Sequence, residues 1–359
     1  MSHNLNFISD YVFLRVGMGI QRRGKGGGVW HFNAKLLLNE DYVKSISDLI
    51  SSESSKGLFL TNIIEGWEVL KLKIKRKSIN FAKRLSFQNK LKEKQLRSKL
   101  MILQQQLNVN VGDFLSVRDE LFELDKVKCE GAILRSKAQY AVEGEKNTAF
   151  FLNLEKTRQS RVYIDKLKNK EGDMDDSFVS ILENVQTYYE ALFCSEVHDV
   201  ILTEHIVNHL DVKLSNVDKV MCDQFLTVKD INNAIDQLLQ NKSPGSDGLT
   251  ANFYVCFRSV LVPILLKLYH EIEIQRVVPG TMAEGLITLL FKKGDRTDIA
   301  NYRPITLLNT DYKILMKIFA NRFKSVINTI VSPTQAYSIP GREVTDIILT
   351  IRDAQRQRE

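Results

Sequence analysis

A block of positive charge lies on a helical repeat in the first third of the sequence. Between Lys71 and Lys99 the chain has twelve Lys or Arg residues and a single acidic residue, Glu93. Apolar residues recur in and around this block with the spacing of one helical face: Trp67, Leu70, Ile74, Leu96, Leu100 and Leu103. We therefore expect one long helix from Gly66 to about Gln106, with an apolar stripe against the protein and cations over the rest of its surface.

So much charge of one sign needs a partner of the other sign. A block of like charges indicates a polyanionic ligand, and nucleic acid is the commonest. The candidate contacts to the phosphates of RNA or DNA are Lys73, Arg76, Lys83 and Arg84. The alternative is that this block is a solvated helix face or contacts another protein.

The rest of the composition is that of an ordinary globular protein. The chain has 359 residues, enough for about two or three domains, and 44% of them are hydrophobic. Its four cysteines lie far apart without a CxxC pair, which favours reduced thiols in the cytoplasm and the nucleus. No apolar run is long enough to cross a bilayer, and the first residues, MSHNLNFISD, lack the pattern of a secretion signal. We expect no membrane partner.

Other segments also show helix or strand patterns. A second helical tract is expected from about Val111 to Tyr140, with a break near Gly131, and another helix from Thr148. The stretch RVYIDKLKNKEGD predicts a strand and a turn, and SFVSILENVQTYYEALF predicts an amphipathic helix. The polar tract 195–223 is the expected domain boundary. Beyond it we expect a helix over 228–239, a turn at SPGSDG and further helices to residue 275.

Three short patterns imitate known chemistry. Residues 19–26, GIQRRGKG, resemble a phosphate-binding loop, but Gly26 stands where Ser or Thr must hold magnesium, so we interpret them as a flexible basic linker. His205 and His209 lie one helical turn apart without the acid and the third ligand of a zinc site, so we expect a solvated helix face. The aspartates of DMDD, residues 173–176, could bind two metal ions only on a rigid hairpin. We expect them in a turn that caps the next helix, because helix N-termini favour acids, and we predict no metal site.

A short charged loop separates two apolar, β-rich runs, GLITLLFKK and YRPITLL. The dipeptide Gly-Asp between them signals a turn, so we expect a hairpin that brings Lys292 and Arg303 to the same end. Like charges that face each other across paired strands are destabilising. Pro304 favours an extended conformation at Arg303, which suits a contact to phosphate oxygens. Either Asp295 and Asp298 neutralise the two bases or an anion binds there, and the spacing alone leaves both open.

Longer motifs resemble a known family. The segments NKSPGSDGLTANFY and LITLLFKKGDRTDIANYRPITLLNTDYKILMKIFANR resemble the fingers region of reverse transcriptases from LINE-type (non-LTR) retrotransposons, and SPTQAYSIPGR resembles the segment that follows there. Upstream, GGVWHFNAKLLLNEDYV and EGEKNTAFFLNLEK resemble the region that joins the endonuclease to the polymerase in the same reading frame. The resemblance covers nearly the whole chain, with its parts in the right order.

The resemblance implies a fold and a division of the chain. It implies an α+β fold, in which long basic helices precede the fingers subdomain of a right-hand polymerase with a small antiparallel sheet. The expected segments are a remnant of the endonuclease end with a glycine-rich connector (1–60), a basic helical connector (61–160), a strand-helix linker (161–227) and the fingers (228–359). The family's metal-binding aspartates lie beyond the residues that match. We therefore expect a chain truncated before the catalytic palm, with no catalytic residue.

The resemblance also assigns the two hairpin cations. In the family a Lys and an Arg on the fingers hairpin hold the triphosphate of the incoming nucleotide, and the matching residues are Lys292 and Arg303. In LLFK, Phe291 stands where the family usually has Pro. The implied partners are deoxynucleotide triphosphate and RNA and DNA as template and primer. Mg²⁺ is the implied cofactor of the complete family enzyme, with none in this chain.

Two functions stay open from the sequence. One is a fragment of an RNA-directed DNA polymerase that is inactive as this chain alone. The other is a non-catalytic nucleic-acid-binding module derived from such an element.

Overall fold

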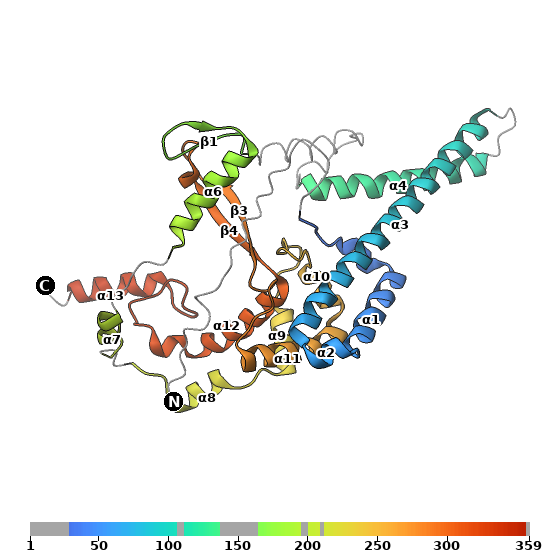
Figure 1. The fold of residues 1–359 in the computed structure, drawn as a ribbon. Helices are drawn as coiled ribbons and strands as arrows, with labels where there is room; N and C mark the ends of the chain where they lie inside the picture. The colour runs from blue at the N-terminus through green and yellow to red at the C-terminus, as the bar shows by residue number, and fades with distance from the viewer. Residues whose placement is uncertain (1–28, 106–110, 137–163, 195–199, 209–211, 357–359) are drawn as a thin grey trace.

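Helices make up most of the described chain, and short strands form two small sheets. The computed structural model describes residues 29–105, 111–136, 164–194, 200–208 and 212–356 (Figure 1). Within them each sheet consists of two antiparallel strands. The predicted α+β fold is therefore confirmed. The glycine-rich stretch GIQRRGKG lies outside the described residues.

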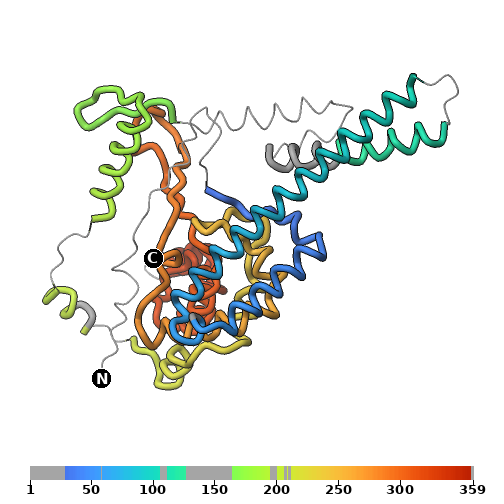
Figure 2. Tube along the Cα trace, turned by 45° about the vertical axis from the view of Figure 1, so that its right-hand side comes forward, coloured from blue at the N-terminus to red at the C-terminus, as the bar shows by residue number. Residues whose placement is uncertain are grey.

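The first described elements lead into one very long helix, α3. In chain order they are η1 (Ala34–Leu38), α1 (Glu40–Ser54), α2 (Gly57–Thr61), α3 (Ile63–Gln105) and α4 (Val111–Ser136). The start of α1 follows from its sequence, because the side chain of Asn39 accepts a hydrogen bond from the N–H of Tyr42 and two acids occupy the first turn. Helix α3 has 43 residues and confirms the predicted long helix. The outer half of α3 and helix α4 form an arm that extends away from the rest of the molecule (Figure 1, Figure 2).

Helix α4 differs from the sequence prediction at one point. The sequence predicts a break near Gly131, but the helix continues through this glycine to Ser136. A glycine inside a helix costs only about 1 kcal/mol relative to alanine, so packing elsewhere can keep the helix intact. In the arm, Leu96 of α3 packs against Val117 and Leu121 of α4 in a small buried cluster. The helix expected from Thr148 begins outside the described residues.

A small hairpin and several helices follow the arm. They are β1 (Leu167–Lys168), β2 (Met174–Asp175), α6 (Phe178–Leu192), α7 (Val200–Asn208), α8 (Asn216–Asp223), α9 (Val228–Asp236), α10 (Ala251–Cys256) and α11 (Arg258–Gln275). The last elements are β3 (Gly285–Phe291), η3 (Ile299–Asn301), β4 (Tyr302–Leu308), α12 (Thr310–Ile330) and α13 (Val344–Arg356). The strand with a turn near residue 167, the helix α6 and the hairpin β3–β4 all lie where the sequence predicts them.

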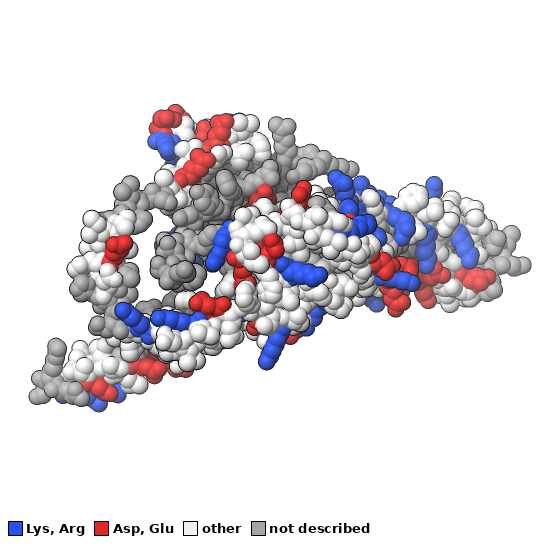
Figure 3. Space-filling model, turned by 60° about the horizontal axis from the view of Figure 1, so that its bottom comes forward, with Lys and Arg blue, Asp and Glu red and all other residues white. Residues whose placement is uncertain are grey.

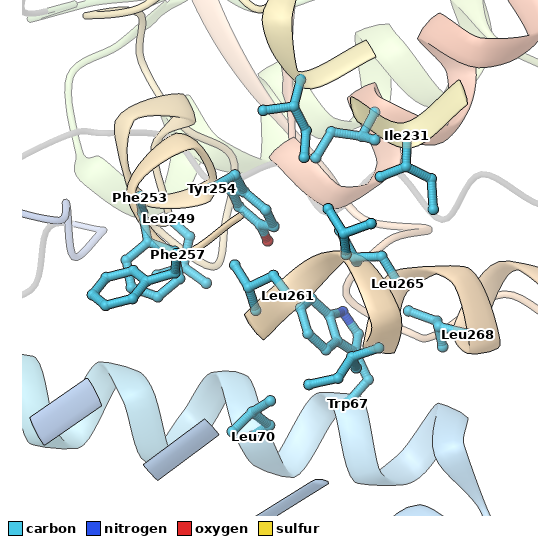
Figure 4. Close-up of a cluster of buried hydrophobic side chains, with 14 of the residues drawn as sticks. Trp67, Leu70, Ile231, Leu249, Phe253, Tyr254, Phe257, Leu261, Leu265 and Leu268 are labelled. Atoms are coloured by element: carbon cyan, nitrogen blue, oxygen red, sulfur yellow. The ribbon is translucent and has the colours of Figure 1, made fainter. Parts of the chain in front are cut away.

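The main hydrophobic core joins the first half of α3 to the elements after residue 225. Trp67 and Leu70 point from α3 toward Leu261 and Leu265 of α11, with Phe253 of α10 close by (Figure 4). Each of these side chains is almost fully removed from water. Full burial of one such side chain contributes about 1.5 to 3 kcal/mol to the free energy of unfolding. This core is therefore the main source of stability in the described chain. The inner half of the basic helix therefore belongs to the same packed body as the motifs that resemble polymerase fingers.

A second, smaller core lies at the far end of the β3–β4 hairpin. There Tyr302 and Ile299 pack against Leu167 of β1 and against Ile181 and Val185 of α6. The hairpin rises from the main body, and α6 and β1 cover its outer end (Figure 1, Figure 2). Helix α6 thus packs on a hairpin that lies more than a hundred residues later in the chain.

Candidate nucleotide and nucleic-acid sites

The register of the β3–β4 hairpin places Lys292 and Arg303 close together. Leu290 is paired with Arg303 and Phe291 with Tyr302, and the N–H of Lys292 donates to the carbonyl oxygen of Asn301 at 3.0 Å. Side chains of successive strand residues point to opposite faces. Lys292 and Arg303 therefore lie on the same face as diagonal neighbours, at the loop end of the hairpin.

The two faces of the hairpin have different environments. Phe291 and Tyr302 lie on the face covered by α6, where their rings meet at a centroid distance of 5.4 Å. Arg303 and Lys292 lie on the other face and are exposed. Beside them the side chains of Leu290 and Ile305 are 53% and 44% exposed. The open face thus offers two cations next to an apolar surface.

The two loop aspartates are engaged by other groups. Asp295 forms an ion pair with Lys168 of β1 at 2.8 Å and accepts a hydrogen bond from the N–H of Thr297. Lys168, and then the backbone bond from Thr297, hold the pKa of the Asp295 carboxyl well below its usual range. Asp298 caps the short η3 helix by accepting from the N–H of Ala300 at 2.9 Å.

Of the two alternatives that the sequence leaves open, neutralisation of the hairpin cations by Asp295 and Asp298 is therefore absent from this arrangement. Among the residues that the structure describes, no ion pair includes Lys292 or Arg303. The sequence did not reveal Lys168 as the partner of Asp295, because 127 residues separate them. The assignment of Lys292 and Arg303 as a triphosphate clamp remains a prediction.

The root of the hairpin is tied to the SPGSDG loop. Asn309, which is fully buried, follows β4 and accepts a hydrogen bond from the N–H of Asp247 at 3.1 Å. Its amide nitrogen donates to the carbonyl oxygen of Thr281 at 2.6 Å and to the hydroxyl of Ser246 at 3.2 Å. A Cβ at Gly245 would overlap the Asn309 side chain, so only glycine fits there. Two motifs that are about sixty residues apart thus form one interlocked structure.

A buried ion pair joins the inner half of α3 to the same root. The ammonium of Lys71 lies 2.8 Å from Oδ2 of Asp311, which also accepts from the indole N–H of Trp67 at 2.8 Å. Lys71 also donates to the hydroxyl of Thr281. Lys71 belongs to the block that is predicted to face a polyanion, and for this residue the prediction is wrong, because its side chain is only 4% exposed. Its spacing from Trp67, one helical turn, places it on the apolar face and could have revealed this.

The four candidate nucleic-acid contacts on α3 lie in different environments. Lys73 forms an ion pair with Glu53 of α1 at 2.5 Å, and the Arg84 guanidinium lies 4.8 Å from the ring centre of Phe81. Arg76 and Lys83 are exposed, and no ion pair within the described residues includes either. Their role in binding RNA or DNA remains a prediction, and these two are its strongest members.

Helix α4 lowers the net charge of the arm. Lys92 pairs with Glu120 at 3.0 Å, and Arg97 lies 3.6 Å from Asp125. Figure 3 shows Lys and Arg side chains in a row along the arm, with Asp and Glu side chains in a neighbouring row. The positive surface is therefore narrower than the sequence of α3 alone indicates.

The patterns that imitate metal sites carry no metal-binding group in the described residues. His205 lies on α7, and His209 lies outside the described residues. The DMDD stretch differs from the expectation, since Met174–Asp175 is a strand of a small hairpin and Ser177, not an aspartate, caps α6. Even so, the described part of the chain brings together no three His, Cys, Asp or Glu side chains that could hold a metal ion. None of its helices combines the length and apolar character that a membrane span requires.

Comparison with known proteins connects this chain to a transposon. A Xenopus laevis protein, "Transposon TX1 uncharacterized 149 kDa protein", is 28% identical over 350 residues, which covers 96% of this chain. The chain spans about a quarter of that relative's length. No family model matches the chain. The similarity supports a transposon origin for nearly the whole chain.

Proposed function

We propose that this chain is the connector and fingers part of an RNA-directed DNA polymerase of a non-LTR retrotransposon. The observation that carries the proposal is the open hairpin face, where Lys292 and Arg303 lie side by side while the loop aspartates bind other groups. The similarity to a transposon protein and the motifs KSPGSDG and NYRPITLLN support the same origin. The expected partners are deoxynucleotide triphosphate, template RNA and primer DNA, in the cytoplasm and nucleus.

The chemistry of the open face suits a nucleotide. The planar guanidinium of Arg303 can donate two parallel hydrogen bonds to phosphate oxygens, and the ammonium of Lys292 adds a second charge. Their mutual repulsion is relieved when an anion binds between them. The half-exposed side chains of Leu290 and Ile305 offer an apolar contact beside the phosphates.

The catalytic step is assigned to no residue of this chain. Nucleotidyl transfer needs carboxylates that hold Mg²⁺ against the triphosphate and the primer hydroxyl, and the described residues contain no group of three or more His, Cys, Asp or Glu side chains that could hold a metal ion. In the proposed enzyme those carboxylates belong to the palm. This chain would bind and orient the nucleotide.

The test is to fuse the chain to a polymerase palm. We expect a fusion of this chain to the palm of a related reverse transcriptase to extend a DNA primer on an RNA template with Mg²⁺. Neither the chain alone nor the palm alone should do so. If the fusion folds and binds primer–template but does not extend it, while the palm's own fingers restore extension, the proposal fails.

A second candidate function rests on the exposed cations of α3. Arg76 and Lys83 point to a nucleic-acid-binding module that has kept no role in polymerisation. An inactive fusion that still binds RNA with strong salt dependence would favour this second function.

A further inference from the structure

One buried ammonium faces two buried carboxylates at the root of the β3–β4 hairpin. Lys71 comes from α3, Asp311 from the first turn of α12, and Asp247 from the SPGSDG loop. The side chains of Lys71 and Asp247 are 4% exposed and that of Asp311 is fully buried. With one positive and two negative charges, the cluster is not neutral if both carboxyl groups are ionised.

The carboxylates of Asp311 and Asp247 differ in their hydrogen-bond partners and in their distance from the Lys71 ammonium. Oδ2 of Asp311 lies 2.8 Å from the ammonium of Lys71 and also accepts from Trp67. Oδ2 of Asp247 lies 3.9 Å from the same ammonium and has no hydrogen-bond partner among the described residues. A buried carboxylate oxygen without a donor is costly, whereas a protonated carboxyl group avoids most of that cost. Asp247 is therefore the member of the cluster that is suited to hold a proton.

Other charged and titratable groups from α3, α10, α11 and α12 also surround the cluster. Glu68 of α3 lies 3.5 Å from the Lys71 ammonium and is a third carboxylate on the same cation. Tyr254 of α10 has a fully buried hydroxyl without a partner among the described residues. Tyr269 of α11 donates its hydroxyl to the carbonyl oxygen of Asp311 at 2.8 Å, and the half-buried Lys313 of α12 is a second cation near Asp247.

The electrostatic balance follows the geometry. Burial, followed by the charge of Asp311, raises the pKa of Asp247 to about 7, although Lys71 acts in the opposite direction. Burial alone would lower the pKa of Lys71, but the carboxylates around it, Asp311 foremost, outweigh burial and raise it. Lys71 therefore stays charged through the neutral range, and Asp247 is the group that changes.

The cluster lies where it can control the hairpin. Thr281, which accepts from Lys71, precedes β3 by four residues, and Asp311 follows the end of β4 by three. Asp247 also accepts at Oδ1 from the N–H of Leu249 at 2.9 Å, and its own N–H is bound by Asn309. A change of charge at Asp247 thus acts on the SPGSDG loop and on both strand ends.

We propose that Asp247 holds a proton in the folded chain near neutral pH and that this proton is a switch for the root of the hairpin. When the pH rises, release of the proton leaves a second buried carboxylate beside Asp311, and the contacts between α3, the SPGSDG loop and the strand ends loosen. When the pH falls, the root tightens. This switch would operate whether or not the chain belongs to a polymerase.

The sign of the pH effect is fixed by linkage. In the folded chain Asp247 keeps its proton to about pH 7, whereas in the unfolded chain it releases it near the ordinary value of about 4. The folded state therefore binds more protons at Asp247 between these limits, so the contribution of Asp247 to stability is largest below about pH 4 and falls as the pH rises to about 7. Above that range the contribution of Asp247 stops changing.

The test compares the full chain with Asp247→Asn, a neutral side chain of the same shape. Between pH 5 and pH 8 we expect the Tm of the unaltered chain to fall by about 3 °C or more relative to that of the variant. Hydrogen exchange of the β3–β4 amides, corrected for intrinsic rates, should lose protection over the same range only in the unaltered chain. Asp48→Asn, a change at an exposed site on α1, is the matched control and should follow the unaltered chain.

Two results would overturn the proposal. One is a pair of Tm profiles that run parallel for the unaltered chain and Asp247→Asn. If that variant does not fold, infrared titration of the unaltered chain decides the question. A protonated carboxyl band that disappears between pH 6 and pH 8 supports the switch, and the absence of such a band contradicts it.

Discussion

The molecule has two cation-rich regions, helix α3 and the β3–β4 hairpin, and they use their charge differently. On α3 several cations form ion pairs within the protein: Lys71 with Asp311, Lys73 with Glu53 and Lys92 with Glu120. On the hairpin Asp295 pairs with Lys168, and Asp298 caps η3. Lys292 and Arg303 therefore face solvent together. The number of charges in a segment is therefore a weaker guide to a ligand site than the engagement of the neighbouring acids.

The largest effect is expected from the buried cation of α3. Lys71→Ala should lower the free energy of unfolding by about 3 to 5 kcal/mol, because it leaves the carboxylate of Asp311 buried without its counter-ion. Chemical denaturation measures this loss. Lys83→Ala, on the exposed face of the same helix, should change stability by no more than about 0.5 kcal/mol. Similar losses for both variants would remove the distinction between the two kinds of cation.

An intermediate effect is expected for nucleic-acid binding by the outer surface of α3. Replacing Arg76 and Lys83 together by glutamine should weaken binding to single-stranded RNA of any sequence. The slope of log K against log salt should decrease by about 0.7 for each lost phosphate contact. Lys73→Gln and Lys92→Gln should change the slope much less, since Glu53 and Glu120 already neutralise these cations. Equal slopes for all variants would assign this face to solvent or to a protein partner.

The smallest effect is expected from the exposed ion pair of the hairpin loop. Because Lys168 and then Thr297 lower the pKa of Asp295, the ionised carboxyl stabilises the folded chain above the unfolded value of about 4. That stability is lost as the pH falls through the lower folded value. Asp295→Asn should therefore reduce the Tm slightly at pH 7 and by less at pH 2. A variant with the same small deficit at both values would show that the ion pair is not the cause.

The sequence predicted the local elements well and the long-range pairings poorly. The periodicity of Trp67, Leu70 and Ile74 predicted α3, and the alternation and turn residues predicted the β3–β4 hairpin. Both signals are local, so spacing is enough to reveal them. The pairing of Lys71 with Asp311 and that of Lys168 with Asp295 join residues more than a hundred positions apart, and no local pattern encodes such partners.

The predicted break near Gly131 is overridden by packing in the arm. The break predicted at Gly131 rests on intrinsic helix preference, which amounts to about 1 kcal/mol. Burial of Leu96, Val117 and Leu121 between α3 and α4 stabilises the arm against a preference of that size. The sequence names the charged residues of a candidate site, but only the fold shows which of them form ion pairs within the protein. The sequence therefore did not show which cations are free to bind a ligand.

The proposed nucleotide site consists of the two hairpin cations, and nucleotide affinity in the fusion to a palm tests them directly. We expect Arg303→Ala to raise the KM for nucleotide roughly ten- to a hundredfold, as the loss of a charged hydrogen bond of about 1.5 to 3 kcal/mol predicts. Lys292→Ala should raise it less, and Arg303→Lys should not restore it, because an ammonium lacks the planar fork of donors. Lys293→Ala, in the same loop, is the control and should leave the KM unchanged. An unchanged KM in Arg303→Ala would contradict the account.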